Sequence, residues 1–169
     1  VFIIDPLYTV PLLIGIGVAL ALRSDKGWRW NLAGLIVSAL YLGWGVFAQH
    51  HVWQVARDSL KAQGIEAVHL LATPTAFNSI LWRIVEVTPD AYLEGFHSLL
   101  DRDRNIAFAS FPRGTALNAA MEGNRHVGLV ARWTQGFYKL DERDGRIVIT
   151  DLRMGQEPYY SFNFIVGQR

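Results

Sequence analysis

Two long stretches without a charged residue dominate the first 48 positions of this 169-residue chain. One runs from Leu7 to Leu22 and the other from Leu32 to Ala48, which is sixteen and seventeen residues. Each is close to the lower limit of about 17 apolar residues that a helix needs to cross a bilayer. We therefore expect two membrane-spanning helices, at about 7–22 and 32–48. The alternative is a helical hairpin in the core of a soluble protein, because runs this short fit both.

Charged residues are distributed unevenly along the chain. The first 48 residues hold three basic and two acidic side chains, whereas residues 49–169 hold thirteen of each. The chain as a whole is 51% hydrophobic and 18% charged, which is too apolar for an average soluble domain. This division predicts a transmembrane helical hairpin over 1–48 and a domain outside the membrane over 49–169. The net charge of +1 does not indicate a nucleic-acid partner.

The polar segment RSDKGWRWN between the two apolar runs predicts their orientation. Its cations are Arg23, Lys26 and Arg29, and the positive-inside rule places such residues in the cytoplasm. Both ends of the hairpin then lie on the opposite face, which in a bacterium is the periplasm. We expect a protein of the bacterial inner membrane with a periplasmic C-terminal domain, and membrane lipids as its immediate partners.

Two further patterns are typical of paired membrane helices. Aromatic residues lie where lipid headgroups would be, and such belts are common at both membrane surfaces. Small residues repeat at a spacing of four, which lets two helices approach closely. The aromatic residues are Trp28 and Trp30 at one end and Tyr8, Trp44 and Trp53 at the other, and the small residues are Gly15 with Ala19 and Gly34 with Ser38.

The residues after Ala48 follow the patterns of strands and short helices. The second apolar helix is expected to continue beyond the membrane and to end at Gly64, because glycine commonly follows the last helical residue. Asp144-Gly145, between two alternating apolar segments, is a strong hairpin signal. Because the strands are clustered and do not alternate with helices, the predicted class is α+β with a mainly antiparallel sheet. Strands are expected within 65–75, 79–88, 91–100, 136–155 and 159–169, and short helices within 114–123 and 124–135.

Asp5 and Pro6 open the first apolar run. Aspartate is a preferred N-cap and proline is favoured at the first helical position, so the pair predicts a helix start. An ionisable group at the membrane edge is also a candidate site. One of the adjacent His50 and His51 is expected to face inward at the same membrane level, where a carboxylate and a neutral imidazole could complete a zinc or other divalent metal site. The alternative is a simple helix cap and two interfacial histidines.

Polar residues interrupt two of the apolar strands. The segment TPTAFNSILWR contains Asn78 and Trp82, and VITDLRMG contains Asp151 and Arg153. Residues two apart lie on the same face of a strand, so Asp151 and Arg153 could form a salt bridge. The alternative is a polar pocket that binds an anionic group with the arginine fork. These four residues are the candidate substrate-binding residues.

Several common enzyme classes have no signature in this sequence. The motifs of phosphate-binding loops, dinucleotide-binding folds, zincins and α/β-hydrolases are absent from it. The chain also has no cysteine, which excludes disulfides, thiolate metal sites and cysteine nucleophiles. We interpret His69, His97 and His126 as packed or exposed single residues.

Three motifs of the chain resemble those of a bacterial inner-membrane family, the membrane-bound metal-dependent hydrolases or YdjM-like group. They are FIIDPLYTVPLLIG, TPTAFNSILWRIV, and GFYKLDERDGRIVITDLRMG followed by PYYSFNF. The resemblance implies several membrane helices followed by an extracytoplasmic domain, with most metal ligands in an N-terminal membrane half that would precede this sequence. Asp5 falls within the first of these motifs and His51 within a further, shorter matched segment, Q-H-V, so the resemblance implies these two residues as metal ligands. Asn78, Trp82, Asp151 and Arg153 are also matched, with no role implied.

The resemblance and the candidate residues together suggest a metal-dependent hydrolase. A metal-activated water would attack an ester or phosphoester near the membrane surface, and the substrate could be lipid-linked. Asp5 would be a ligand or general base, His51 a ligand or its supporting partner, and Arg153 would hold an anion. The rival hypothesis is a non-catalytic membrane protein whose periplasmic domain binds a partner or senses envelope stress.

Overall fold

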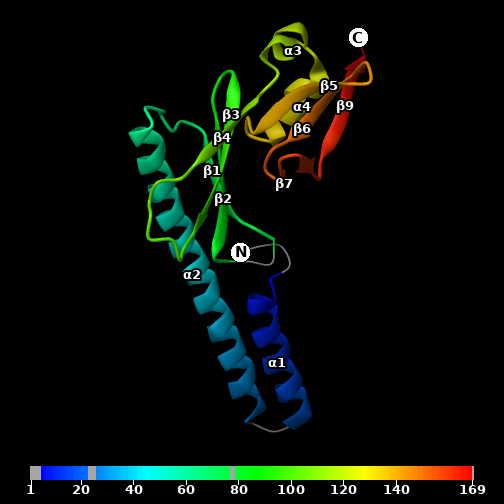
Figure 1. Ribbon diagram of the computed structural model, residues 1–169. Helices are drawn as coiled ribbons and strands as arrows, with labels where there is room; N and C mark the ends of the chain where they lie inside the picture. Colours follow the sequence, from blue (N-terminus) through cyan, green and yellow to red (C-terminus); the bar gives the residue numbers. More distant parts are fainter. Residues whose placement is uncertain (1–4, 23–25, 77–78, 169) are drawn as a thin grey trace. The chain divides into compact units, whose positions relative to one another are not determined.

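The computed structural model describes residues 5–22, 26–76 and 79–168. Two N-terminal helices are followed by strands and two short helices (Figure 1), so the predicted α+β class is confirmed. The contacts divide the chain into two compact units. Unit 1 comprises the described residues of Val1–Ser59, Ala72–Arg83 and Phe96–Ile106, and unit 2 comprises those of Leu60–Leu71, Ile84–Gly95 and Ala107–Arg169.

The N-terminal helices are α1 (Pro6–Leu22) and α2 (Gly27–Ala62). α2 is a single helix of 36 residues, so it continues without a break past Ala48, as predicted. Its end also lies where the sequence predicts it. Gly64 has a positive φ of 76°, and the Ile65 amide donates back to the Leu60 carbonyl at 2.9 Å, which is a common glycine-dependent helix terminus.

The apolar surface of these helices is largely exposed. Among the described residues α2 is the helix that is long and apolar enough to cross a membrane. Only 22% of its apolar 18-residue segment is buried, whereas the core helix of a soluble protein would be mostly buried. One such helix is a weak indication of membrane association, and α1, although apolar, is 17 residues long. The exposed apolar side chains include Leu13, Leu20, Leu40, Val46 and Phe47.

Small residues bring the backbones of α1 and α2 into contact. A Cβ atom added to Gly34 would lie 2.5 Å from the Pro11 carbonyl oxygen, and one added to Gly15 would lie 2.9 Å from the Trp30 oxygen. Ser38 Oγ donates a hydrogen bond to the Tyr8 carbonyl at 2.9 Å. The small-residue pattern of the sequence therefore lies at the contact between the two helices.

The first sheet has four strands in the order β1-β2-β3-β4. They are β1 (Leu70–Pro74), β2 (Leu81–Val87), β3 (Ala91–Ser98) and β4 (Phe108–Pro112). β3 and β4 are antiparallel, with Ala91 opposite Pro112 and Gly95 opposite Phe108. The sequence does not predict β4, which is a strand of only five residues.

The second sheet has three strands and lies within unit 2, together with α3 (Thr115–Ala120) and α4 (Arg125–Trp133). Its order is β5 (Tyr138–Arg143), β6 (Arg146–Asp151) and β9 (Asn163–Gln168), all antiparallel. Asp144 and Gly145 both have positive φ, 52° and 71°, as the predicted two-residue hairpin turn requires. The short strands β7 (Gly155–Gln156) and β8 (Tyr159–Tyr160) form a separate hairpin.

One face of the three-stranded sheet carries a hydrophobic core that side chains of the short helices complete. Its buried members on the strands are Tyr138, Leu140, Ile147, Ile149 and Val166, and they alternate as expected for a sheet with one covered face. Val127 of α4 is buried with them, and Leu117, Met121 and Val130 pack against the cluster.

Candidate functional site

Asp5 caps α1 and is joined to α2. Its Oδ1 atom accepts a hydrogen bond from the Leu7 amide at 3.0 Å, and its carbonyl accepts from the Thr9 amide at 3.0 Å. Its Oδ2 atom accepts from the Tyr41 hydroxyl at 2.7 Å. The predicted N-cap is confirmed, and both carboxylate oxygens already have partners. No sequence pattern predicts Tyr41 as the partner of Asp5, because the two residues lie on different helices and are far apart in the sequence.

His51 is not close to Asp5 in the structure. It is exposed on α2, ten positions after Tyr41, the residue that contacts Asp5. Ten residues correspond to about 15 Å along a helix axis, which is far beyond the reach of two ligands to one ion. The adjacent His50 contacts Gln54 on the same helix, with its Nε2 atom 3.0 Å from the amide nitrogen.

His97, on β3, is the histidine whose titration His51 influences. Burial lowers the pKa of His97, the Asp101 carboxylate opposes this by raising it, and the nearby His51 and Arg104 side chains lower it further. The His97 Nδ1 atom lies 3.9 Å from Asp101 Oδ2. The interpretation of His97 as a packed single residue agrees with its burial.

The predicted ligands do not fit one metal ion. Catalytic zinc sites use three protein ligands, and the part of the chain that the structure describes contains no group of three or more suitable side chains. The Asp5 carboxylate is hydrogen-bonded to the Leu7 amide and to the Tyr41 hydroxyl, and His51 lies on α2 far from this carboxylate. No reaction step is derived through a metal from these residues.

Trp82 lies in the interior of the protein. Its side chain is 1% exposed, and its indole N–H donates to the Ser79 carbonyl at 3.1 Å. These contacts indicate a packing role for this candidate substrate-binding residue. Asn78, the other candidate in the same motif, lies outside the described residues.

Asp151 and Arg153 bind each other. β6 ends at Asp151, so Arg153 lies in the turn that follows and not on the same strand. Asp151 Oδ2 accepts from Arg153 Nη2 at 2.9 Å, and Oδ1 accepts from Nε at 3.1 Å and from the Arg153 amide at 2.9 Å. The guanidinium carbon also lies 4.8 Å from the centre of the Trp133 ring. The arginine fork is therefore occupied by a carboxylate of its own motif.

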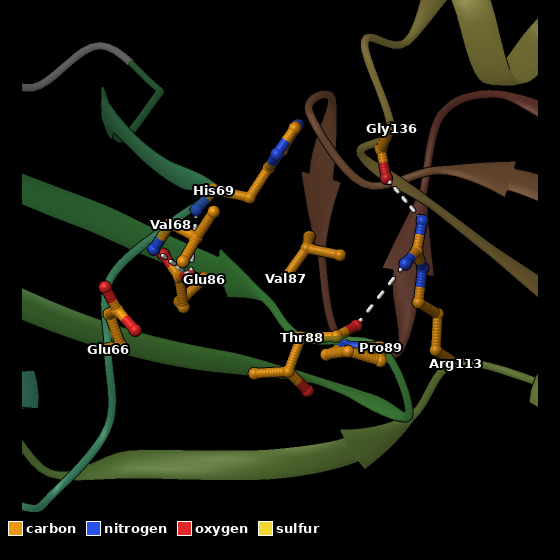
Figure 2. A pocket seen from close by; sticks show the side chains of 9 residues that line it. All are labelled: Glu66, Val68, His69, Glu86, Val87, Thr88, Pro89, Arg113 and Gly136. Carbon is orange, nitrogen blue, oxygen red and sulfur yellow. Dashed lines mark hydrogen bonds between the residues drawn. The ribbon is translucent and has the colours of Figure 1, made fainter.

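A cavity that the sequence did not predict lies within unit 2. It has a volume of ≈ 330 Å³ and contains charged groups at both sides and apolar groups between them (Figure 2). The segment before β1, the end of β2 with its turn, the residue after β4 and the residues after α4 all contribute to it. Its lining residues are Glu66, Val68, His69, Glu86, Val87, Thr88, Pro89, Arg113 and Gly136.

Glu86 is the most unusual residue of this cavity. Its side chain is 1% exposed, and its Oε1 atom accepts from the amides of Val68 and His69, both at 2.9 Å. Its Oε2 atom is buried and has no hydrogen-bond partner within the described residues. A buried hydrogen-bond acceptor without a partner costs about 1–3 kcal/mol, and more when its group is charged. Such an atom beside a cavity indicates a place where a donor can bind.

Arg113 lies on the other side of the cavity and is held by backbone carbonyls. It donates from Nε to Tyr138 at 3.1 Å, from Nη1 to Thr88 at 3.3 Å and from Nη2 to Gly136 at 2.8 Å. Its guanidinium carbon lies 4.7 Å from the centre of the Tyr138 ring. A guanidinium has five N–H donors, so two remain beyond these three bonds.

The imidazole of His69 is fixed at the edge of the same cavity. Its Nε2 atom lies 2.5 Å from the Gln135 carbonyl oxygen, which can only accept, so Nε2 carries a proton. The ring packs on Phe137 with a centroid distance of 4.8 Å. We interpreted His69 from the sequence as a single packed or exposed residue, and the structure places it instead among the cavity residues.

A buried charged network lies elsewhere in unit 2. Lys139 Nζ donates to Glu157 Oε1 and lies 3.2 Å from the Tyr92 hydroxyl, which also donates to Glu157. Burial alone would raise the pKa of Glu157, but the hydrogen bonds from Lys139 and Tyr92 outweigh burial and lower it. Burial and the hydrogen bond to Glu157 raise the pKa of Tyr92. Lys139 Nζ also lies 3.5 Å from Asp141 Oδ2, so these side chains pair with one another, which indicates a structural role.

Comparisons with known proteins add no identification. No protein-family model, no curated protein and no solved structure matches this chain.

Proposed function

We propose that this protein is a membrane-anchored binding protein of the bacterial inner membrane. α1 and α2 would cross the bilayer as a hairpin, and the remainder would lie in the periplasm and bind a small ligand in the Glu86 cavity. The observation that carries this proposal is the carboxylate of Glu86, a residue that lines the cavity and whose buried Oε2 atom has no partner among the described residues. An unpartnered buried carboxylate oxygen is costly, and binding sites retain such groups because a ligand satisfies them.

The membrane part of the proposal is supported by exposure and by helix contact. The apolar side chains of α1 and α2 face outward, and the two backbones touch at Gly15 and Gly34. Close approach through small residues is typical of helices in lipid, where apolar burial does not drive association. Reporter fusions placed at Gly27 and after Arg169 test the topology. The proposal expects opposite sides, with Gly27 cytoplasmic, and the same side for both would contradict it.

Binding in the cavity can be tested with a variant that fills it. Val68 lines the cavity and is 75% exposed, so Val68→Trp can occupy the space without disturbing a core. Ligand-observed NMR with a library of small polar fragments would be recorded on the full chain in detergent micelles. We expect fragments to bind wild type and to be lost from Val68→Trp but not from the control Ile165→Trp, which is exposed on β9. Equal fragment binding to Val68→Trp and wild type would contradict the proposed function.

The metal-dependent hydrolase is the second candidate function, and the motif resemblance is the observation in its favour. In that function the substrate would be an ester or phosphoester at headgroup depth, and Asp5 or His51 would ligate zinc, though not the same ion, because they lie far apart. Metal content of the purified full chain tests it. Zinc that is retained by wild type and lost in either Asp5→Asn or His51→Ala would favour the hydrolase over the binding protein. Zinc content that is the same in all three proteins would remove these two residues as ligands.

A further inference from the structure

The cavity carries opposite charges on its two sides. Glu66 and Glu86 lie to one side and Arg113 to the other, as the sticks in Figure 2 show. Val68, Val87 and Pro89 provide apolar surface in the same cavity. A ligand that satisfies all of these groups needs a cationic donor, a short apolar part and an anionic group.

The side of the cavity that contains Glu66 and Glu86 favours a positively charged hydrogen-bond donor. Oε1 of Glu86 is already bound by two amides, and Oε2 is the atom without a partner among the described residues. A primary ammonium has three N–H donors and a full positive charge, so it can bind Oε2 and still face the exposed Glu66 carboxylate. Hydrogen bonds to charged groups contribute about twice as much as neutral ones, which favours an ammonium over a hydroxyl.

The side of the cavity that contains Arg113 favours an anion. Arg113 is fixed by three carbonyls, and within the described residues no carboxylate lies at ion-pair distance from it. Its two remaining N–H donors can bind a carboxylate or phosphate oxygen, for which a guanidinium is well suited. Because the carbonyls already hold the side chain in place, little side-chain entropy is lost when an anion binds.

We propose that the ligand of the Glu86 cavity is a small zwitterion that carries a primary ammonium at the Glu86 side and an anionic group at the Arg113 side. This inference rests on the proposed function and names the ligand class for the same cavity. A cavity of ≈ 330 Å³ is at the small end of ligand sites, which suits a molecule of the size of an amino acid or an aminoalkyl phosphate. The same chemistry occurs in free small molecules and in the headgroup of phosphatidylethanolamine.

Binding of matched probes to the full chain in detergent micelles tests the two-charge requirement. The zwitterions β-alanine and phosphoethanolamine would be compared with ethanolamine, which has only the ammonium, and with propionate and methyl phosphate, which have only the anion. We expect at least one zwitterion to bind at least tenfold more tightly than any of the three single-charge probes. Glu86→Gln should remove this advantage while leaving the anion-only probes unchanged, and Glu122→Gln, at an exposed residue two positions after α3, is the matched control.

The outcomes separate this inference from the proposed function. A single-charge probe that binds as tightly as both zwitterions would overturn the zwitterion and leave the cavity as a binding site. The same holds if no probe binds while fragments still bind wild type and not Val68→Trp. If fragments bind Val68→Trp and wild type equally, the proposed function fails and the inference fails with it.

Reconstitution into nanodiscs distinguishes the two sources of the zwitterion. Phosphatidylethanolamine discs would be compared with phosphatidylcholine discs, in which three methyl groups replace the ammonium hydrogens. Reduced binding of soluble phosphoethanolamine in phosphatidylethanolamine discs alone would support a lipid headgroup. Equal binding in both discs would support a free zwitterion. Binding of the fully methylated phosphocholine as tightly as phosphoethanolamine would overturn the primary ammonium.

Discussion

Tyr41 on α2 donates its hydroxyl proton to Oδ2 of Asp5 on α1 at 2.7 Å. The same carboxylate caps α1 through its other oxygen, which accepts from the Leu7 amide. One side chain thus starts a helix and joins it to the next. This relationship accounts for a carboxylate at the beginning of an apolar helix without a metal.

Substitutions of Asp5 and Tyr41 should therefore rank in a definite order. Asparagine can still cap α1 but presents an amide in place of the second acceptor, so Asp5→Asn and Tyr41→Phe should each cost about 1.5–3 kcal/mol, the range for a hydrogen bond to a charged group. Asp5→Ala should cost about 1 kcal/mol more because the cap is lost as well. Thermal unfolding of the full chain in detergent measures this, with Tyr8→Phe as control.

A double-mutant cycle makes that test specific. If Asp5 and Tyr41 act through their mutual hydrogen bond, combining Asp5→Asn with Tyr41→Phe should cost little more than either change alone. Strict additivity of the two changes would show that the bond does not contribute to stability.

The contact between α1 and α2 predicts opposite effects for two glycines of α2. A Cβ at Gly34 would lie 2.5 Å from the Pro11 carbonyl oxygen, whereas one at Gly43 would meet nothing within 4 Å. Glycine is about 1 kcal/mol less favourable than alanine inside a helix, so Gly43→Ala should be neutral or stabilising. Gly34→Ala should lower the thermal midpoint because the backbones must separate. A Gly34→Ala protein as stable as wild type would show that the close approach is not needed.

Stability should fall as the pH drops below the ordinary histidine value. Burial lowers the pKa of His97 in the folded state from 6.5, so between that value and the folded pKa the unfolded chain binds more protons. His97 thus contributes stability that is present above about pH 6.5 and is lost as the pH falls through the folded pKa. Thermal midpoints between about pH 5 and 8 should decline less steeply in His97→Gln. The exposed His126 on α4 is the control, and His126→Gln should keep the wild-type slope.

The Lys139–Glu157 pair should contribute to the loss of stability in acid. The pKa of Glu157 lies below its ordinary 4.5 in the folded state, so its contribution is present above that value and is lost as the pH falls through the folded pKa. Glu157→Gln should cost at most about 3–5 kcal/mol near neutral pH, because buried Lys139 loses its nearer carboxylate and keeps Asp141 at 3.5 Å. Lys139→Met combined with Glu157→Gln should recover part of that loss. Chemical denaturation measures both, and no recovery in the double variant would contradict a mutual pairing.

Local features of the fold could be predicted from the sequence because their causes lie within a few residues. The cap at Asp5, the helix end at Gly64 and the hairpin turn at Asp144-Gly145 each depend on one residue and its immediate backbone. β4 was missed because a five-residue strand acquires its pattern only from pairing with β3. The two N-terminal helices could be predicted because each contains a continuous apolar run. Their orientation in a membrane stays a prediction.

The candidate site could not be predicted because it is assembled from distant segments. Glu86 reads in the sequence as one charge in a strand, and only the fold shows that one of its oxygens lacks a partner among the described residues. Arg113 lies 27 positions further along and was not singled out by any motif. By contrast, the salt bridge between Asp151 and Arg153, which was one of the two interpretations of this pair, could be predicted because the residues are only two positions apart.

The continuity of α2 has a mechanical consequence. At about 1.5 Å per residue a helix of this length extends about 54 Å, well beyond the roughly 30 Å of a hydrocarbon core. Beyond the apolar part, Ser59 of the same helix is bonded to the Ile106 amide at 2.8 Å, and Gln49 donates to the Ala72 carbonyl at 3.0 Å. A bilayer of different thickness changes the tilt of a membrane helix. In the proposed topology, α2 would pass such a change of tilt directly to β1 and to the segment before β4, which are hydrogen-bonded to it, because the helix has no break that could absorb the change.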